Sequence, residues 1–168
     1  MISTRTFLVV AAAALLAAAS MDASAGHRLN HSAQFCHKSG SDGTLSAQWQ
    51  GTITNTSPTR NMRVLCPVVR LAGLGTTGKA HVHVIDRNLN AGVQCSFYNQ
   101  RAYGHTWVWS GWKTSLGSGP SNYRTFTFPA QASQDSWGGF HHFHCILPPK
   151  DSTYGASVLA SYSTGTND

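Results

Sequence analysis

The sequence has 168 residues, and its 12 lysine and arginine side chains outnumber 6 carboxylates, all of them aspartates, to give a formal net charge of +6. This length corresponds to about one domain, and the absence of glutamate excludes an H-E-x-x-H metalloprotease site and argues against long helices. The positive balance attracts anionic surfaces or serves solubility alone, and the basic residues form no run that would indicate a specific nucleic-acid site.

The N-terminal segment has the pattern of a secretory signal peptide. A short positive start precedes an unbroken apolar run at residues 7–19, and an Ala-x-Ala cleavage site ends at Ala25. The apolar run is shorter than the roughly 20 residues that a membrane-spanning helix needs. We therefore predict that residues 1–25 are removed and that residues 26–168 form a single domain with no transmembrane segment. The mature protein is then periplasmic or extracellular.

The mature part contains all four cysteines of the chain: Cys36, Cys66, Cys95 and Cys145. An even number of cysteines in an oxidising compartment favours two disulfides over free thiols. Three pairings are open, and spacing alone does not distinguish them. We favour Cys36 with Cys66 and Cys95 with Cys145.

Alternation of apolar and polar residues predicts β-strands after the signal peptide. The segment 45–54 alternates over its whole length, which predicts one half-buried strand with Trp49 on the buried side. Three later segments show the same period. Their predicted inward-facing residues are Val64, Cys66 and Val68, then Val93, Cys95 and Phe97, and finally Val158, Ala160 and Tyr162.

Further strands are expected where β-branched and aromatic residues lie between turn-rich stretches. They span residues 79–86, 105–112, 123–128 and 140–147. About eight short strands at this spacing predict an all-β fold, an antiparallel β-sandwich of jelly-roll or immunoglobulin-like type. Pro67 lies inside its strand, which indicates an edge position or a bulge there.

Six short motifs follow one another along the mature chain: GTITNTS, LCPVVR, HVHVIDRN, VQCSF, CILPPKDS and VLASYST. With an early cysteine before them, they resemble an uncharacterised family of small secreted bacterial four-cysteine proteins. The resemblance covers most of the mature chain. It implies a disulfide-bearing β-sandwich and no assigned activity.

Two histidine pairs are the best indication of a metal site. His81 with His83, and separately His142 with His144, have the i, i+2 spacing that puts both rings of a pair on one face of a strand. Imidazole binds zinc and copper, and four rings would complete a site if the two strands were neighbours. Exposed strand positions also accept histidine without function. We therefore predict no resident cofactor, and name these four side chains as the ligands of any zinc or copper that binds.

Aromatic residues gather in one short stretch of the chain. The candidate ligand-binding residues are Tyr103, Trp107, Trp109 and Trp112, with Arg101 and Lys113 as neighbouring cations. Flat aromatic faces stack on sugar rings and on bases. Trp107 and Trp109 share one face of their strand. Because most tryptophans are largely buried, the favoured interpretation is that this face packs into the core and that Trp112 alone is exposed.

Signatures of catalysis are weak. The sequence has no G-x-S-x-G motif, and the glycines of Gly73-x-Gly75-x-x-Gly78 precede a predicted strand, where a dinucleotide site needs a helix. The sequence therefore favours an exported, non-catalytic binding or structural module for anionic envelope or polysaccharide surfaces. The alternative is a secreted enzyme, either hydrolytic or dependent on a histidine-bound metal.

Overall fold

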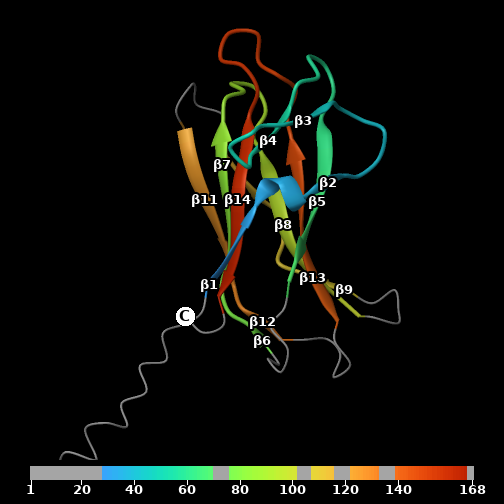
Figure 1. Ribbon diagram of the computed structural model, residues 1–168, viewed down its shortest axis with the longest axis vertical. Helices are drawn as coiled ribbons and strands as arrows, with labels where there is room; N and C mark the ends of the chain where they lie inside the picture. Colours follow the sequence, from blue (N-terminus) through green and yellow to red (C-terminus); the bar gives the residue numbers. More distant parts are fainter. Residues whose placement is uncertain (1–27, 70–75, 102–106, 116–121, 133–138, 166–168) are drawn as a thin grey trace, which may run out of the picture.

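The computed structural model describes residues 28–69, 76–101, 107–115, 122–132 and 139–165. Within these ranges the protein is an antiparallel β-sandwich made of two six-stranded sheets, with a two-stranded sheet at one end (Figure 1). No helix among these residues is long and apolar enough to cross a membrane. The predicted all-β sandwich is confirmed.

The first sheet, sheet A, has the strand order β11-β7-β14-β4-β3, and β1 pairs with β14. Its strands are β1 (Arg28–Ser32), β3 (Leu45–Ala47), β4 (Ile53–Asn55), β7 (Ala80–Asp86), β11 (Asn122–Phe128) and β14 (Val158–Gly165).

The second sheet, sheet B, has the order β10-β8-β13-β5-β2, and β9 pairs with β8. Its strands are β2 (His37–Lys38), β5 (Met62–Val68), β8 (Gln94–Gln100), β9 (Trp107–Trp109), β10 (Lys113–Thr114) and β13 (Phe140–Leu147). The small sheet pairs β6 (Thr76–Thr77) with β12 (Gln131–Ala132), and the 3-10 helix η1 (Ala33–Phe35) leads the chain from sheet A to sheet B.

The core lies between the two sheets and follows the predicted alternation of β5 and β8. The inward-facing residues predicted for these strands are all buried: Val64, Cys66, Val68, Val93, Cys95 and Phe97. Sheet A covers them from the other side. Its largest buried side chains are Ile53, Val82, Val84, Phe128, Leu159 and Tyr162.

Both disulfides lie in sheet B. Cys36, which follows η1, bonds to Cys66 of β5, and Cys95 of β8 bonds to Cys145 of β13, its direct cross-strand partner. No cysteine remains free. The favoured pairing is therefore confirmed, and one of the two bonds joins adjacent strands at the centre of the sheet.

The segment predicted as one strand at 45–54 is a hairpin of β3 and β4. The turn between them closes with a hydrogen bond from the Gly51 amide to the Gln48 carbonyl, 3.0 Å long. Gly51 has a φ of +85°, a conformation that favours glycine. Trp49 at the tip of the turn is 88% exposed. The prediction of a buried Trp49 is wrong. The alternation of apolar and polar residues continues through the turn between β3 and β4, so the sequence pattern does not show that the chain reverses there.

A bulge interrupts β14. The register of β14 against β7 shifts between Leu159 and Ser161. Leu159 and Tyr162 therefore face the core. The predicted inward set is correct for Tyr162. Val158 is buried as well, at 7% exposure, but it lies beneath a groove on the outer side of sheet A, and Ala160 lies within the bulge.

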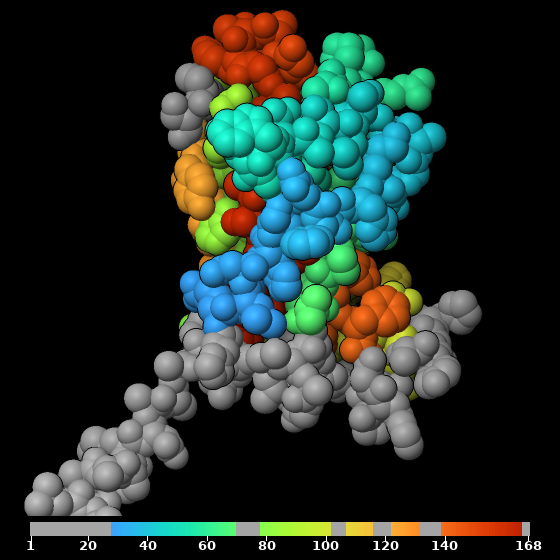
Figure 2. All heavy atoms as spheres, viewed as in Figure 1, coloured from blue at the N-terminus to red at the C-terminus, as the bar shows by residue number. Residues whose placement is uncertain are grey.

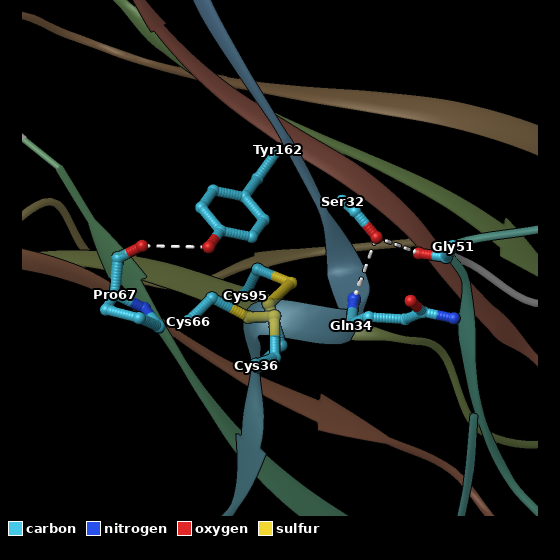
Figure 3. The surroundings of a disulfide bond; sticks show 9 residues. Ser32, Gln34, Cys36, Gly51, Cys66, Pro67, Cys95 and Tyr162 are labelled. Carbon is cyan, nitrogen blue, oxygen red and sulfur yellow. Dashed lines mark hydrogen bonds between the residues drawn. A yellow bond between two sulfur atoms is a disulfide. The ribbon is translucent and has the colours of Figure 1, made fainter.

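One hydrogen bond crosses the core and links the sheets. The Tyr162 hydroxyl of β14 donates to the carbonyl oxygen of Pro67 in β5 over 2.8 Å (Figure 3). Burial raises the pKa of Tyr162 to about 12, so the hydroxyl keeps its proton at neutral pH. Pro67 pairs with β13 on one side, and β2 pairs with β5 only at Leu65 and Val64. The predicted edge position of Pro67 is confirmed.

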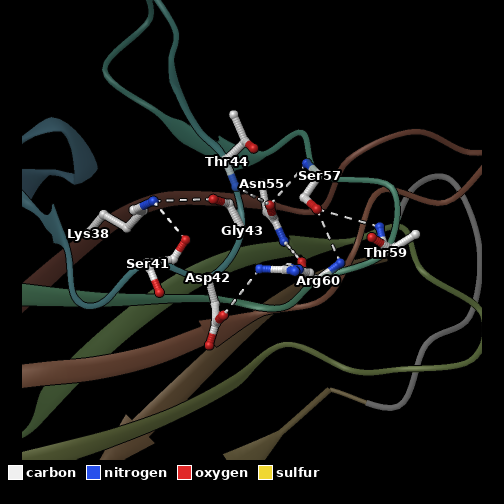
Figure 4. A network of polar contacts seen from close by, with 9 residues as sticks. All are labelled: Lys38, Ser41, Asp42, Gly43, Thr44, Asn55, Ser57, Thr59 and Arg60. Carbon is white, nitrogen blue, oxygen red and sulfur yellow. Dashed lines mark hydrogen bonds and ion pairs between the residues drawn. The ribbon is translucent and has the colours of Figure 1, made fainter.

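A buried amide organises the loops at the far end of the sandwich. The side chain of Asn55 donates to the carbonyl oxygen of Arg60 and accepts hydrogen bonds from the backbone amides of Thr44 and Ser57 (Figure 4). It also donates to the carbonyl oxygen of Pro148. These contacts hold three separate loops together. A buried amide with all these partners is stabilising, since an unpaired one would be costly.

A buried carboxylate fixes the same end of β7. Asp86 accepts hydrogen bonds from the hydroxyls of Ser115 and Ser157, at 2.6 and 3.0 Å, and from the backbone amide of Asn88. Ser115 follows β10 and Ser157 precedes β14. Asp86 therefore points into the sandwich and ties sheet A to the edge of sheet B.

Candidate functional site

The outer face of sheet B carries a continuous group of aromatic rings. On β8 and β13 the residues that alternate with the buried ones point outward, and β9 pairs so that Trp109 lies opposite Tyr98 and Trp107 opposite Gln100. We call this group the aromatic face. Its members are Tyr98, Trp107, Trp109, Trp112, Phe140, His142 and His144.

Tyr98 lies at the centre of the aromatic face. Its ring is nearly parallel to those of Trp107 and Trp109, with centroid distances of 5.9 and 6.2 Å and interplanar angles of 12° and 17°. On its other side the ring of His142 is 5.2 Å away at an angle of 5°. Offset parallel stacking of this kind is attractive and fixes the orientation of each ring. The aromatic face is thus ordered before any ligand arrives.

The tryptophans of β9 are exposed. Trp107 is 51% and Trp109 is 48% accessible to solvent. The expectation that these two rings pack into the core is wrong. Alternation predicts correctly that they share a face, but the pairing of β9 with the edge of β8 turns that face outward.

Trp112 joins the same face from the segment between β9 and β10. It is 41% exposed, as predicted, and its ring lies 5.3 Å from that of His144 at an angle of 60°. Alternation alone would put Trp112 on the opposite side from Trp107 and Trp109. Between them, however, Gly111 has a φ of +78°, which breaks the strand and returns Trp112 to the side of its neighbours.

The histidines of the aromatic face are neutral at neutral pH. Burial lowers the pKa of His142, and the nearby His144 and His37 lower it further. Burial, followed by the charge of Arg63, lowers the pKa of His144. Neutral imidazoles keep one ring nitrogen as donor and the other as acceptor. They therefore add hydrogen-bonding groups to the surface without adding charge.

A hollow adjoins the aromatic face on the side of β5. It measures about 310 Å³, and the residues that line it include His37, Leu65, Pro67, Gln100, Phe140 and His142. Three of them, Gln100, Phe140 and His142, also belong to the face or its strands. A long ligand lying across the strands would therefore meet rings over β9 and β8 and then a depression beside β5.

One of the two cations expected beside the tryptophans, Lys113, does not lie with them. Lys113 lies opposite Cys95, on the core side of the sheet, and its Nζ is 5.7 Å from the ring centroid of Phe128 in sheet A. Arg101 is exposed just after β8. Tyr103, the remaining member of the predicted group, lies outside the described residues. The structure thus separates Lys113 from the aromatic face.

The four histidines named as metal ligands do not come together. His81 and His83 lie on the outer face of sheet A, where each Nδ1 is 3.0 Å from a threonine hydroxyl of β11. His142 and His144 lie on the outer face of sheet B, so the whole sandwich separates the two pairs. Zinc–nitrogen distances are about 2.0–2.1 Å. The condition for a single site built from all four rings is therefore not met, because the strands that carry the two pairs belong to different sheets.

The described part of the chain contains no group of three or more His, Cys, Asp or Glu side chains that could hold a metal ion. The second histidine pair has another role in the structure. His142 stacks on Tyr98, and His144 contacts Trp112. Both rings are part of the aromatic surface.

Comparisons with known proteins give information on the fold. No family model and no curated protein matches the sequence. Among solved structures, the xylan-binding module CBM15 aligns with a TM-score of 0.52 and 9% identity, over 84% of this chain and 97% of that one. Xylan-binding modules share this fold.

Two further solved structures support the same conclusion. The CBM22-1 xylan-binding domain of Paenibacillus barcinonensis Xyn10C aligns with a TM-score of 0.51 and 12% identity, over 87% of this chain and 99% of that one. The low-affinity xylan-binding module CBM86 from Roseburia intestinalis aligns at 0.50 and 11%, over 83% and 95%. Identities this low establish the fold and leave the ligand to be argued from the site.

The central member of the site is absent from the residues that the sequence singles out. Tyr98 has the opposite alternation from the buried Cys95 and Phe97 and was therefore predictable as outward-facing. Phe140 could have been found in the same way on β13. The hollow beside β5 had no sequence signal, because it depends on how far β2 extends along its neighbour.

Proposed function

We propose that the protein is a non-catalytic polysaccharide-binding module and that the aromatic face is its binding surface. The observation that carries the proposal is the exposure of Trp107, Trp109 and Trp112 on one sheet, where Tyr98 and His144 connect their rings into one group. A soluble protein seldom exposes a contiguous apolar group of this kind without a binding role. The fold shared with xylan-binding modules supports the same interpretation.

The chemistry of the aromatic face suits sugar rings. A pyranose has an apolar face of C–H groups that stacks on an aromatic ring, and hydroxyls around its rim that need hydrogen-bond partners. The tryptophans supply the stacking surface, and the neutral ring nitrogens of His142 and His144 supply partners. The Nε2 of His144 is buried and has no hydrogen-bond partner among the described residues.

Order within the face favours binding. The stack of Tyr98 with Trp107, Trp109 and His142 holds the rings in place, so that little side-chain entropy is lost when a ligand binds. The net charge of +6 adds long-range attraction for acidic polysaccharides and anionic envelope polymers. In this proposal, ring stacking stabilises the bound polysaccharide, and the net positive charge attracts anionic polymers to the protein before they bind.

The proposal includes export to the periplasm or the medium. Residues 1–25, the predicted signal peptide, lie outside the described residues. Two disulfides in a small domain are typical of proteins that fold in an oxidising compartment. An intact-mass measurement on protein recovered from the periplasm or medium should give a chain that begins at Gly26. Exported protein that retains Met1 would contradict this part of the proposal.

Affinity electrophoresis through gels containing xylan, mannan, pectin or alginate tests the binding surface. We expect at least one of these polymers to retard the protein. The Trp109→Ala variant should lose about ten-fold or more in affinity, because one aromatic stacking contact contributes about 1–3 kcal/mol.

Trp49→Ala is the matched control, since it removes an even more exposed tryptophan from the tip of the β3–β4 turn, away from the aromatic face. It should leave retardation by neutral polymers unchanged. Equal losses in the two variants would show that any exposed tryptophan suffices. Retardation by none of the four polymers at low salt would overturn the proposal.

A further inference from the structure

A second groove lies on the outer face of sheet A. Val158 of β14 pairs with Ile85 of β7 and with Thr54 of β4, and these positions alternate with the core residues of each strand. The groove above them measures about 380 Å³. Gln48, Gln50, Thr52 and Thr54 of the β3–β4 hairpin line it on one side, and in the space-filling view the turquoise atoms of this hairpin lie below the red atoms of the loop that precedes β14 (Figure 2). The hairpin therefore forms one wall of the groove.

The groove combines an apolar floor with polar walls. Ile85 and Val158 form part of the floor, and Gln50 and Thr52 of the hairpin lie on one wall. Arg87, which follows β7, and Lys150, from the loop after β13, lie on the lining as well. No carboxylate is among the lining residues.

Both cations lack a partner within the described part of the chain, and the Nε of Arg87 is buried. Neither the guanidinium of Arg87 nor the ammonium of Lys150 has a hydrogen-bond or ion-pair partner among the described residues. The base of Arg87 is fixed, because its backbone amide donates to the Ser157 hydroxyl over 2.9 Å.

The nearest aspartates along the chain are engaged elsewhere. Asp86 precedes Arg87 but points into the sandwich, where two serine hydroxyls and one amide bond to it. Asp151 follows Lys150 and accepts the backbone amides of Thr153 and Tyr154 within its own turn. Neither carboxylate therefore occupies the position that a ligand anion would take between the two cations.

We infer that this groove binds an acidic sugar residue, a uronate, of a polysaccharide chain. A uronate offers an apolar ring face to Ile85 and Val158, hydroxyls to the hairpin wall, and a carboxylate to the cations. The planar guanidinium of Arg87 can hold a carboxylate through two parallel hydrogen bonds, and Lys150 adds a second charge. The site is separate from the aromatic face, since it lies on the opposite sheet, and it goes beyond the function proposed for that face.

A titration with a trimer of galacturonic acid tests the inference. Amide shifts in the NMR spectrum of the isotopically labelled protein should concentrate on β4, Arg87 and Lys150. The Arg87→Gln/Lys150→Gln variant should bind the trimer at least ten-fold more weakly. Arg87→Lys keeps the charge but loses the paired hydrogen bonds, so it should give an intermediate loss. The methyl-esterified trimer, which lacks the negative charge, should bind weakly or not at all.

Two control variants separate this groove from the rest of the protein surface. Lys79→Gln removes a positive charge from the other end of β7, about 26 Å from Arg87 at 3.3 Å per residue. Trp109→Ala removes a ring from the aromatic face. Neither should change the affinity for the acidic trimer, and the groove variant should keep the binding of neutral polymers to the aromatic face. Failure of the aromatic face alone would therefore leave the groove standing.

Three results would overturn the inference. One is unchanged trimer binding in the Arg87→Gln/Lys150→Gln variant with a native NMR spectrum. Another is equal binding of the methyl-esterified trimer, which would remove the role of the carboxylate. The third is equal binding of a sulfated neutral trisaccharide, which would show a general response to anions.

Discussion

The two outer faces of the sandwich have opposite chemistry, although the same alternation builds both. The outer face of sheet B exposes stacked aromatic rings around Tyr98. The outer face of sheet A pairs histidines with hydroxyls, as in the contacts of His81 with Thr127 and of His83 with Thr125. Period-two patterning therefore separates core from surface, and the residue types at the outward positions decide what each surface can bind.

The two sheets also differ in how they are fastened. Both disulfides attach to sheet B, and one of them joins β8 to β13 directly beneath the aromatic face. Sheet A is held by hydrogen bonds and packing, and its groove is walled by a hairpin. We interpret the disulfides as a means of keeping the aromatic rings in register. No disulfide joins two strands beneath the groove of sheet A.

The largest effect is expected from removing the bond beneath the aromatic face. Cys95→Ala/Cys145→Ala should lower the free energy of unfolding by about 2–5 kcal/mol, as for other small secreted domains. Polysaccharide binding should weaken as well, because Tyr98 and His142 stand on the two strands that this disulfide joins. Urea unfolding and affinity electrophoresis measure the two effects. If the binding of the acidic trimer to sheet A fell as much as binding to the aromatic face, the contrast between the sheets would be wrong.

The next largest effect is expected on polysaccharide binding when one exposed aromatic ring is removed from either outer face. Trp112→Ala should lose about 1–3 kcal/mol of polysaccharide binding if its ring stacks on a sugar. Tyr123→Ala on sheet A removes a ring that is 57% exposed and stacks on His83, and it should leave that binding unchanged. Parallel titrations of both variants with the polymer that retards the wild type decide the matter. A loss only in Tyr123→Ala would move the binding surface to sheet A.

A smaller effect is expected where the sheets are linked. Tyr162→Phe removes the hydrogen bond to Pro67 and should lower the free energy of unfolding by about 1 kcal/mol. The raised pKa of about 12 predicts that part of the wild-type stability, fully present below pH 10, is lost as the pH rises through 12. Unfolding at neutral and alkaline pH should show that Tyr162→Phe lacks this loss. Identical alkaline profiles would contradict the role of the phenol.

The smallest effect is a difference in acid sensitivity. The lowered pKa values of His142 and His144 mean that these rings bind fewer protons in the folded than in the unfolded protein. Their stabilising effect is present above the ordinary histidine pKa of 6.5 and is lost as the pH falls through the lowered folded values. His142→Gln/His144→Gln should therefore flatten the fall in stability below pH 6.5.

The matched variant for sheet A is His83→Gln. Burial, with a contribution from Arg28, lowers the pKa of His83 too. The His83→Gln variant should change the pH dependence of stability less than His142→Gln/His144→Gln does. It removes one imidazole, whereas the double variant removes two that repel each other when both are charged. Urea midpoints between pH 5 and pH 7 give the comparison. A larger change in His83→Gln would place the acid-sensitive group on sheet A.

The sequence predicted most of the core correctly for a physical reason. An inward residue on a regular strand must be apolar, so Val64, Val93 and Phe97 could be recognised without any knowledge of their neighbours. The errors lie where the chain departs from a regular strand. Gly51 turns the chain through a hairpin, and the bulge beside Leu159 shifts the alternation by one residue.

The candidate site was harder to predict because it depends on strand order. Alternation shows that Trp107 and Trp109 share a face, but only the pairing of β9 with β8 shows that this face is exposed. In the same way, the i, i+2 spacing shows that the two rings of each histidine pair share one face of a strand. Their placement on opposite sheets follows from long-range pairing, which spacing within one strand does not encode.

The pairing of β1 with β14 determines how the domain resists a mechanical pull. Arg28, the first described residue, lies directly opposite Gly165, the last, and the two strands run antiparallel. A force applied at these two residues would break the hydrogen bonds between β1 and β14 one after another, in an unzipping geometry, and would not load them all at once in shear. Peeling of β1 would then advance until it reached Cys36, whose bond to Cys66 stops it. The domain would yield softly at its ends while the sheet that carries the aromatic rings stayed intact.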